Sequence, residues 1–183
     1  MRHIAIIGTG YVGLVSGSGI SDFGHKVICA DINEEKINLL NKVQIPIYES
    51  GLDELVLRNI QANRLSFTTN LKEAIQKSEV VFISVGTPQS ENGEADISAV
   101  KAVAKTIGEN LNNKKVLITG ASGGIGRALC YKFLENNCVL ICTSTNTDKL
   151  NKLKNELGSN HFFYKLDLSY TDQISEIFEL ISE

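Results

Sequence analysis

Two glycine-rich turns, each between a short apolar run and an amphipathic stretch, constrain the fold more than any other feature. The first is GTGYVG at 8–13, after IAII, and the second is TGASGGIG at 119–126, after KVLI. A strand, a glycine turn and a helix in this order begin a βαβ unit of a dinucleotide-binding fold. A chain of 183 residues fits one ordinary domain or one large one, so two such turns need an explanation.

The rest of the chain continues the alternation of strands and helices. Runs such as VVFISV are almost continuously apolar, which indicates strands of a parallel sheet covered by helices on both faces. The expected strands are Ile4–Ile7, Lys26–Ala30, Leu65–Thr68, Val80–Val85, Lys115–Thr119, Val139–Thr143 and Phe162–Leu166. The expected helices are Tyr11–Phe23, Glu34–Lys42, Leu52–Asn63, Leu71–Gln76, Ile97–Leu111, Ile125–Glu135, Asp148–Leu157 and Asp172–Ile181. The pattern predicts an α/β fold with a doubly wound parallel Rossmann-type sheet.

The first turn has the spacing of a pyrophosphate-binding loop. Gly8 permits the tight turn, Gly10 lets the backbone approach a pyrophosphate, and Gly13 allows close packing of helix on strand. Asp31 ends the next strand, where its carboxylate can accept hydrogen bonds from both ribose hydroxyls and would repel a 2′-phosphate. The expected cofactor is therefore NAD rather than NADP, and the alternative is a tight turn that binds no ligand.

Residues 1–113 resemble the NAD-binding N-terminal domain of the UDP-glucose/GDP-mannose dehydrogenase family. The matching stretches are IAIIGTGYVGLVSG, ADINEEKINLLN, IPIYESGLDELV, RLSFTTNLKEAI, VVFISVGTPQ and EADISAV, with Ser50 where the family usually has proline. The resemblance implies cofactor contacts from Gly8, Gly10, Tyr11, Val12, Gly13, Asp31, Lys36, Val85, Gly86 and Thr87. For Lys36, a solvated helix lysine remains the alternative.

Residues 114–183 resemble the N-terminal part of a short-chain dehydrogenase/reductase, most closely the 3-oxoacyl carrier-protein reductases. The resemblance implies a second, weaker candidate loop and an adenine contact by Asp167 and Leu168. The loop residues are Gly120, Ser122, Gly124, Ile125 and Gly126. The strand after this loop ends in Thr143, Ser144 and Thr145 instead of an acid, which would suit the 2′-phosphate of NADP at this second loop.

The expected strand Lys115–Thr119 can belong to both segments. If Lys115–Thr119 is both the fifth strand of the first segment and the first strand of the second, the chain forms one continuous sheet of about seven strands in the order 3-2-1-4-5-6-7. Its switch point lies between strands 1 and 4, at the first loop. We therefore expect the second loop to bind weakly, and a replacement of Gly124 chiefly to lower stability.

The catalytic motifs of both families are missing. No cysteine is followed by x-Pro-Lys, because the only prolines are Pro46 and Pro88, and no tyrosine has a lysine four positions later. His3, His25 and His161 are isolated, so no metal site and no catalytic residue is predicted.

The composition limits partners and compartment. The net charge of −3, without a Lys/Arg cluster, excludes a nucleic-acid or anionic-membrane surface, and no apolar run approaches the roughly 18 residues of a transmembrane helix. Four cysteines without a CxxC pair indicate reduced core residues of a cytoplasmic protein. Assembly into a homo-oligomer remains one of the alternatives.

Taken together, these patterns predict a domain that binds NAD without turning over substrate. Two alternatives remain: a hybrid or engineered Rossmann fold without activity, and a dehydrogenase subunit completed by another chain. The expected segments are 1–113 and 114–183, sharing one sheet.

Overall fold

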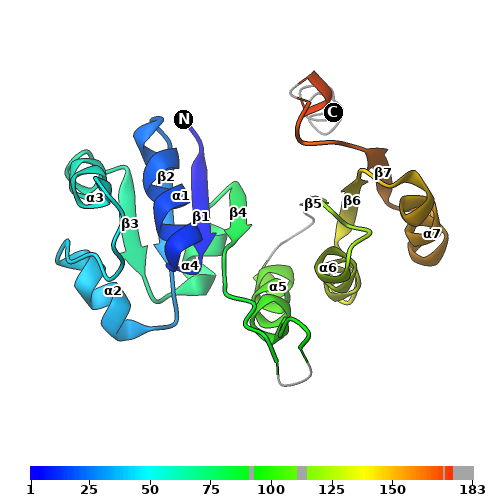
Figure 1. Cartoon of the computed structure of the whole chain (residues 1–183), viewed down its shortest axis with the longest axis horizontal. Coiled ribbons are helices and arrows are strands. Elements are labelled where there is room, and N and C mark those ends of the chain that lie inside the picture. The colour runs from blue at the N-terminus through cyan, green and yellow to red at the C-terminus, as the bar shows by residue number, and fades with distance from the viewer. Residues whose placement is uncertain (91–92, 111–114, 171, 175–183) are drawn as a thin grey trace. The chain divides into compact units, whose positions relative to one another are not determined.

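The computed structural model describes residues 1–90, 93–110, 115–170 and 172–174 and contains two compact units, Met1–Leu111 and Asn112–Glu183 (Figure 1). The elements of the first unit are β1 (His3–Ile7), α1 (Tyr11–Asp22), β2 (Lys26–Ala30), α2 (Glu34–Asn41), α3 (Leu52–Gln61), β3 (Leu65–Thr68), α4 (Leu71–Gln76), β4 (Val80–Ile83) and α5 (Ser98–Asn110). Those of the second are β5 (Lys115–Ile118), α6 (Gly124–Leu134), β6 (Val139–Ser144), α7 (Thr147–Leu157) and β7 (Phe162–Lys165). The predicted α/β Rossmann-type fold is confirmed.

The first unit is a four-stranded parallel sheet in the order β3-β2-β1-β4. Ile7, the last residue of β1, pairs with Ala30 on one side and with Ile83 on the other. Helices α1 and α3 pack against each other, and α4 packs against α5. The connections run in one direction from β1 to β3 and in the other to β4, so the switch point of this unit lies between β1 and β4, where ligands bind in open α/β sheets.

The core of the first unit lies between the sheet and the helices α1, α2 and α3. Its buried members come from alternate positions of the strands and from one stripe of each helix, as the periods of the two structures require. They are Ile4, Ile6, Leu14, Val27, Cys29, Ile37, Leu40, Leu52, Val56, Leu65 and Phe67. This packing holds the carboxyl end of β1, and the glycine turn after it, against the start of α1.

Polar side chains begin several helices. The N-cap residues Asn33, Asn70 and Asn146 each accept a hydrogen bond from the backbone three residues later, at 2.9, 3.1 and 2.9 Å. Asp96 Oδ1 accepts from the backbone N–H of Ser98, 2.8 Å away, at the start of α5, and Gly158 ends α7 with a φ of +88°. The expected helix Asp172–Ile181 lies outside the described residues beyond position 174.

The second unit is a three-stranded parallel sheet in the order β5-β6-β7. The prediction of one continuous sheet in the order 3-2-1-4-5-6-7 was therefore wrong, because β4 and β5 end two separate hydrogen-bonded sheets. An apolar strand pattern indicates that a strand is covered by helices, but it does not specify which strand lies beside it. No helix within the described residues is long and apolar enough to cross a lipid bilayer.

Candidate functional site

The first glycine turn has backbone geometry that side chains would block at two of its three glycines. Gly8 has a φ of +102°, and a Cβ there would lie 2.7 Å from the carbonyl oxygen of Ser84. A Cβ on Gly13 would lie 1.8 Å from the carbonyl oxygen of Gly8. Glycine is therefore required at both positions, at the first for the turn and at the second for the close approach of α1 to the turn.

Gly10 differs from the other two glycines because a Cβ on it would meet nothing within 4 Å. It is the N-cap residue of α1, with extended backbone and no side chain to accept from the first turn of the helix. The N–H groups at a helix start are orphan donors with a positive local potential. Open space beside such donors fits a phosphate group that approaches the backbone.

Asp31 receives hydrogen bonds on both carboxylate oxygens. Its Oδ2 accepts from the backbone N–H of Thr9 at 2.8 Å, from Thr9 Oγ1 at 2.8 Å and from Lys36 Nζ at 3.2 Å. Its Oδ1 accepts from the backbone N–H of Asn33 at 3.0 Å. A carboxylate offers about four lone-pair directions. Oδ2 is therefore saturated by protein donors, whereas Oδ1 keeps room for one more.

These donors hold Asp31 in its charged form. Burial raises the pKa of its carboxyl group, but the hydrogen bonds from Thr9, Asn33 and Lys36 outweigh burial, and the pKa lies below its ordinary value of 3.8. The side chain of Asp31 is 13% exposed. The end of β2 therefore presents a fixed negative charge with one oxygen available as an acceptor.

Thr9 is a site residue that the sequence reasoning missed. It is fully buried, and its backbone and its hydroxyl both bind the same oxygen of Asp31. A hydroxyl residue between the first two glycines of the turn was the available signal. Its partner lies 22 positions away, so only the parallel pairing of β1 with β2 reveals the contact.

Of the remaining predicted residues of the first site, Tyr11, Val12 and Val85 lie at or next to the turn. Tyr11 and Val12, in the first turn of α1, are 55% and 68% exposed, and the Tyr11 hydroxyl donates to the carbonyl oxygen of Tyr48 at 3.0 Å. Val85 follows β4, and its backbone nitrogen would lie 3.0 Å from a Cβ on Gly8. Gly86 and Thr87 continue from there into exposed chain, and no described contact brings Thr87 to the turn.

The second glycine turn, in the other unit, has similar local geometry. Gly120 has a φ of +63°, and a Cβ on Gly126 would lie 2.3 Å from the carbonyl oxygen of Gly120. A Cβ on Gly124 would meet nothing within 4 Å, so the expectation that Gly124 serves mainly turn and packing was wrong. Close packing depends on Gly126 instead. Ile125 is exposed, and Ser122 Oγ lies 2.6 Å from Ser144 Oγ.

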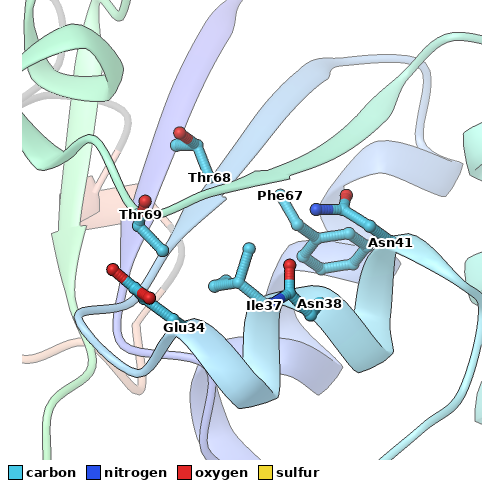
Figure 2. Close-up of a pocket in the computed structure, with 7 residues that line it drawn as sticks. All are labelled: Glu34, Ile37, Asn38, Asn41, Phe67, Thr68 and Thr69. Carbon is cyan, nitrogen blue, oxygen red and sulfur yellow. The ribbon is translucent and has the colours of Figure 1, made fainter.

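A polar groove flanks the first site on the other side of β2. Figure 2 shows its lining residues on α2 and at the end of β3. Its volume is about 280 Å³. Its lining residues are Glu34, Ile37, Asn38, Asn41, Phe67, Thr68 and Thr69. The groove adjoins Asp31, whose backbone N–H donates to the carbonyl oxygen of Thr68 at 3.2 Å. It is smaller than most small-molecule pockets, which measure roughly 300–1,000 Å³.

The pKa is raised above its ordinary value at three of the four cysteine thiols, and contact with Cys130 lowers that of the fourth, Cys142. All four are free and buried. Burial raises the pKa of the Cys29 thiol to about 12, and contact with Cys142 together with burial raises the pKa of Cys130. Among the residues that the structure describes, no three or more His, Cys, Asp or Glu side chains are grouped to hold a metal ion.

Comparison with known proteins matches each segment to a dehydrogenase family. Residues 2–123 match the model of the UDP-glucose/GDP-mannose dehydrogenase family, NAD binding domain, and residues 114–183 match that of the short chain dehydrogenases. The chain is 52% identical over 126 residues to the UDP-glucose 6-dehydrogenase TuaD of Bacillus subtilis, covering 69% of this chain and 27% of that protein. It is 51% identical over 124 residues to the UDP-glucose 6-dehydrogenase of Rhizobium meliloti, covering 67% and 28%. The chain thus spans little more than a quarter of these relatives.

Solved structures show the same fold at lower identity. A GDP-mannose dehydrogenase from Pseudomonas aeruginosa matches with a TM-score of 0.69 and 23% identity, over 97% of this chain and 48% of that one. A UDP-glucose dehydrogenase from Pyrobaculum islandicum matches with a TM-score of 0.68 and 22% identity, over 100% and 49%. With the first glycine turn and Asp31 in place at the carboxyl edge of the sheet, the chain belongs to the UDP-glucose/GDP-mannose dehydrogenase family, of which it contains the NAD-binding domain.

Proposed function

We propose that the first unit binds NAD in preference to NADP and that the chain does not turn over substrate by itself. The preference depends on Asp31. Its Oδ1 has one acceptor position left after the bond from Asn33, and a ribose hydroxyl can donate to it. The 2′-phosphate of NADP is ionised near neutral pH, so it has no hydrogen to donate to Asp31. The negative charge of Asp31 would also repel it.

Lys36 supports the proposal by its position. Its ammonium group is 3.2 Å from Asp31 Oδ2, so it is paired with the carboxylate and holds it in place. The pair leaves Asp31 Oδ1 as the acceptor for the ribose. We assign one ribose hydroxyl to this oxygen and the pyrophosphate to the open space at Gly10, beside the start of α1.

The proposed lack of turnover depends on chemistry that the sequence does not contain. Oxidation of an alcohol through a thiohemiacetal needs a nucleophilic thiol, and the four thiols are buried. Reduction of a ketone needs a proton donor next to the nicotinamide, and no tyrosine is followed by lysine at the spacing of the short-chain reductases. We also assign the chain to a reducing, cytoplasmic compartment, since all four cysteines are free.

The experiment measures NADH binding to the chain, and the Asp31 variant assigns that binding to the first turn. NADH fluorescence reports the bound dinucleotide, and NAD⁺ or NADP⁺ is then added as a competitor. We expect NAD⁺ to displace NADH at lower concentration than NADP⁺. Asp31→Asn should weaken NADH binding about tenfold or more, because hydrogen bonds to charged groups are worth roughly 1.5–3 kcal/mol, and should reduce the discrimination against NADP⁺.

A matched control separates this effect from general loss of charge. Glu35 lies in the first turn of α2, four positions after Asp31, and is exposed, so Glu35→Gln removes the same charge without touching the carboxylate site. It should leave NADH binding unchanged. Equal displacement by NAD⁺ and NADP⁺ from the unmutated protein, or the same affinity in Asp31→Asn, would contradict the proposal.

A further inference from the structure

Two of the four thiols lie against each other in the core of the second unit. The Sγ atom of Cys130, on α6, is 3.7 Å from the Sγ atom of Cys142, on β6. Both residues are fully buried, and neither belongs to the site proposed for NAD. Both thiols are free, so the contact joins two reduced sulfurs where α6 packs on β6.

The fold holds both sulfurs in place. Strand β6 is the middle strand of its sheet, and Cys142 pairs with Ile118 on β5 and with Phe163 on β7. Cys130 lies on the buried stripe of α6, one turn after Gly126. The close approach of the two sulfurs is therefore a consequence of the packing of the unit, and not of two exposed side chains that happen to meet.

The distance between the sulfurs is short enough to be closed by a covalent bond. The S–S distance of a disulfide is about 2.05 Å, so the two sulfurs need to approach by about 1.7 Å. Hydrogen bonds to both neighbouring strands hold Cys142. The helix that carries Cys130 is not part of the sheet, so it can shift toward the strand while both side chains rotate. A small movement of α6 is sufficient.

The contact also makes the two thiols unequal. Contact with Cys130 lowers the pKa of the Cys142 thiol and outweighs its burial, whereas contact with Cys142, together with burial, raises the pKa of Cys130. Cys142 is therefore the thiol that ionises first, with the S–H group of Cys130 as its hydrogen-bond donor. The thiolate, and not the thiol, is the form that attacks an oxidant.

Separation along the sequence would favour a different disulfide. Cys138 lies between the other two cysteines of this unit, and a shorter loop costs less entropy to close. In the fold, however, Cys138 directly precedes β6, so four extended residues of about 3.3 Å each place it about 13 Å from Cys142. Its Sγ atom lies 3.8 Å from the carbonyl oxygen of Asn136 instead. Cα atoms more than about 7 Å apart cannot be bridged without movement of the backbone.

We propose that Cys130 and Cys142 form a redox pair, which hydrogen peroxide converts into a reversible disulfide between α6 and β6. The thiolate of Cys142 attacks one oxygen of the peroxide, the O–O bond breaks, and hydroxide leaves, which gives a sulfenic acid on Cys142. The sulfur of Cys130 then attacks the sulfur of Cys142, so that the S–S bond forms and the S–O bond breaks. The two thiols lose two electrons and two protons, and the peroxide is reduced to two molecules of water.

The burial of the pair selects the reagent. Hydrogen peroxide is little larger than water and can enter during local opening of the helix, whereas a nucleotide sugar cannot reach the sulfurs. In a reducing compartment the dithiol is the resting state and the disulfide is transient. The bond would fix α6 beside the strand that supports the second glycine turn, because the carbonyl oxygen of Thr143, next to Cys142, accepts from the backbone N–H of Ala121 at 2.9 Å.

Peptide mapping by mass spectrometry tests the proposal on the full chain. The folded protein is treated with hydrogen peroxide at neutral pH, and the remaining thiols are then alkylated under denaturing conditions. We expect the loss of two hydrogens, one link between Cys130 and Cys142, and alkylated Cys29 and Cys138. Dithiothreitol should restore all four thiols. The same chain oxidised in urea should form links to Cys138, which would show that the selection of Cys130 requires the fold.

Hydrogen exchange measures the structural effect of the bond. In the oxidised chain, the amide hydrogens of α6 and β6 should exchange at least about tenfold more slowly, because the link opposes local separation of helix and strand. The amides of β1 and α1, in the other unit, should exchange at an unchanged rate and serve as an internal control.

Three variants locate the bond. Cys130→Ala and Cys142→Ala should each abolish the link and the change in exchange. Cys138→Ala removes a buried thiol of the same unit and should leave both unchanged, so it is the matched control. Circular dichroism checks the fold of each variant. Alanine is favourable inside a helix, so Cys130→Ala keeps the test valid if Cys142→Ala fails to fold.

The other outcomes overturn the proposal. These are a link to Cys138 in the folded chain, disulfides between two chains, a sulfinic acid on Cys142 without a link, a link that survives Cys130→Ala, or unchanged exchange in α6 and β6. None of these results affects the test of NAD at the first unit, because that test uses the reduced chain and follows NADH.

Discussion

Gly13→Ala tests whether the first turn depends on a glycine for packing rather than for ligand approach. The Cβ of alanine would lie 1.8 Å from the carbonyl oxygen of Gly8 and 3.2 Å from the Cβ of Ser84. Ordinary contact needs about 3.5 Å, so helix and turn would have to separate by more than about 1.5 Å. Gly8 cannot yield freely, since its N–H donates to the carbonyl oxygen of Ala30 at 2.7 Å.

The size of the effect follows from two opposing contributions. Overpacking a well-packed region costs roughly 1–3 kcal/mol, occasionally more, and the short distance to a backbone atom places this case at the upper end. Alanine is favoured over glycine inside a helix by about 1 kcal/mol, which offsets part of the loss. We expect the free energy of unfolding of the first unit to fall by about 2 kcal/mol, or on the order of 10 °C in Tm.

Two other glycines of the same region provide controls. Gly19 lies in α1 with nothing within 4 Å of an added Cβ, so Gly19→Ala should stabilise the unit through helix propensity alone. Gly10→Ala is also free of contacts and should change stability little while weakening NADH binding. Urea unfolding followed by circular dichroism gives the stabilities, and fluorescence titration gives the affinities. If Gly13→Ala unfolds at the same urea concentration as Gly19→Ala, the reasoning about close packing is refuted.

Three further predictions concern chemistry and pH. With UDP-glucose and NAD⁺, or with a 3-oxoacyl thioester and NADPH, the absorbance of the reduced cofactor should stay at the baseline without enzyme; turnover that survives alkylation of the cysteines would reveal a catalytic group that we missed. The pKa of Asp31 is lowered by folding, so its contribution to stability is present above its unfolded value of about 3.9 and is lost as pH falls from there through the folded pKa. Thr9→Val removes one bond to the carboxylate and raises the folded pKa, so the loss should be smaller and should end at a higher pH; urea unfolding at a series of pH values down to about pH 3 measures it, and an unchanged pH profile would exclude the hydroxyl bond. Burial lowers the pKa of His161, whose Nδ1 accepts from the backbone N–H of Leu140 at 3.2 Å. The second unit should therefore lose stability as pH falls below about 6.5, because the imidazole must then take up a proton in the folded state. His161→Gln should flatten this pH profile, and an unchanged profile would show that the imidazole is already charged at neutral pH.

The positions of the strands and helices were predictable because they depend on local patterns. Continuous apolar runs, glycine turns and cap residues act over a few residues, so β1, the first turn and α1 follow from the sequence alone. Strand β4 ended earlier than expected, at Ile83 instead of Val85, because Ser84 is the last residue whose N–H donates to β1, at Ile7. The end of a strand depends on the last hydrogen bond to the neighbouring strand, and the apolar pattern of one strand does not specify that bond.

The chemistry of the two loops was only partly predictable. Asp31 was expected at the end of its strand because the spacing from the glycines is itself a sequence property. Its hydrogen bonds from Thr9 were not, since they join residues that only the pairing of β1 with β2 brings together. The sequence showed that no acid ends the strand after the second turn. It did not show that Ser144, at the end of that strand, lies with its Oγ 2.6 Å from the Oγ of Ser122 in the turn.

The sequence by itself determined that the chain contains two strand–glycine turn–helix units and which glycine pattern each one has, because these are properties of consecutive residues. Tertiary structure alone decided that the strands form two sheets, that Gly126 rather than Gly124 needs the absence of a side chain, and that Asp31 keeps one acceptor position. The physical reason is that sheet order, close approach and hydrogen-bond saturation depend on atoms brought together from distant parts of the chain, and apolar periodicity carries no record of those partners.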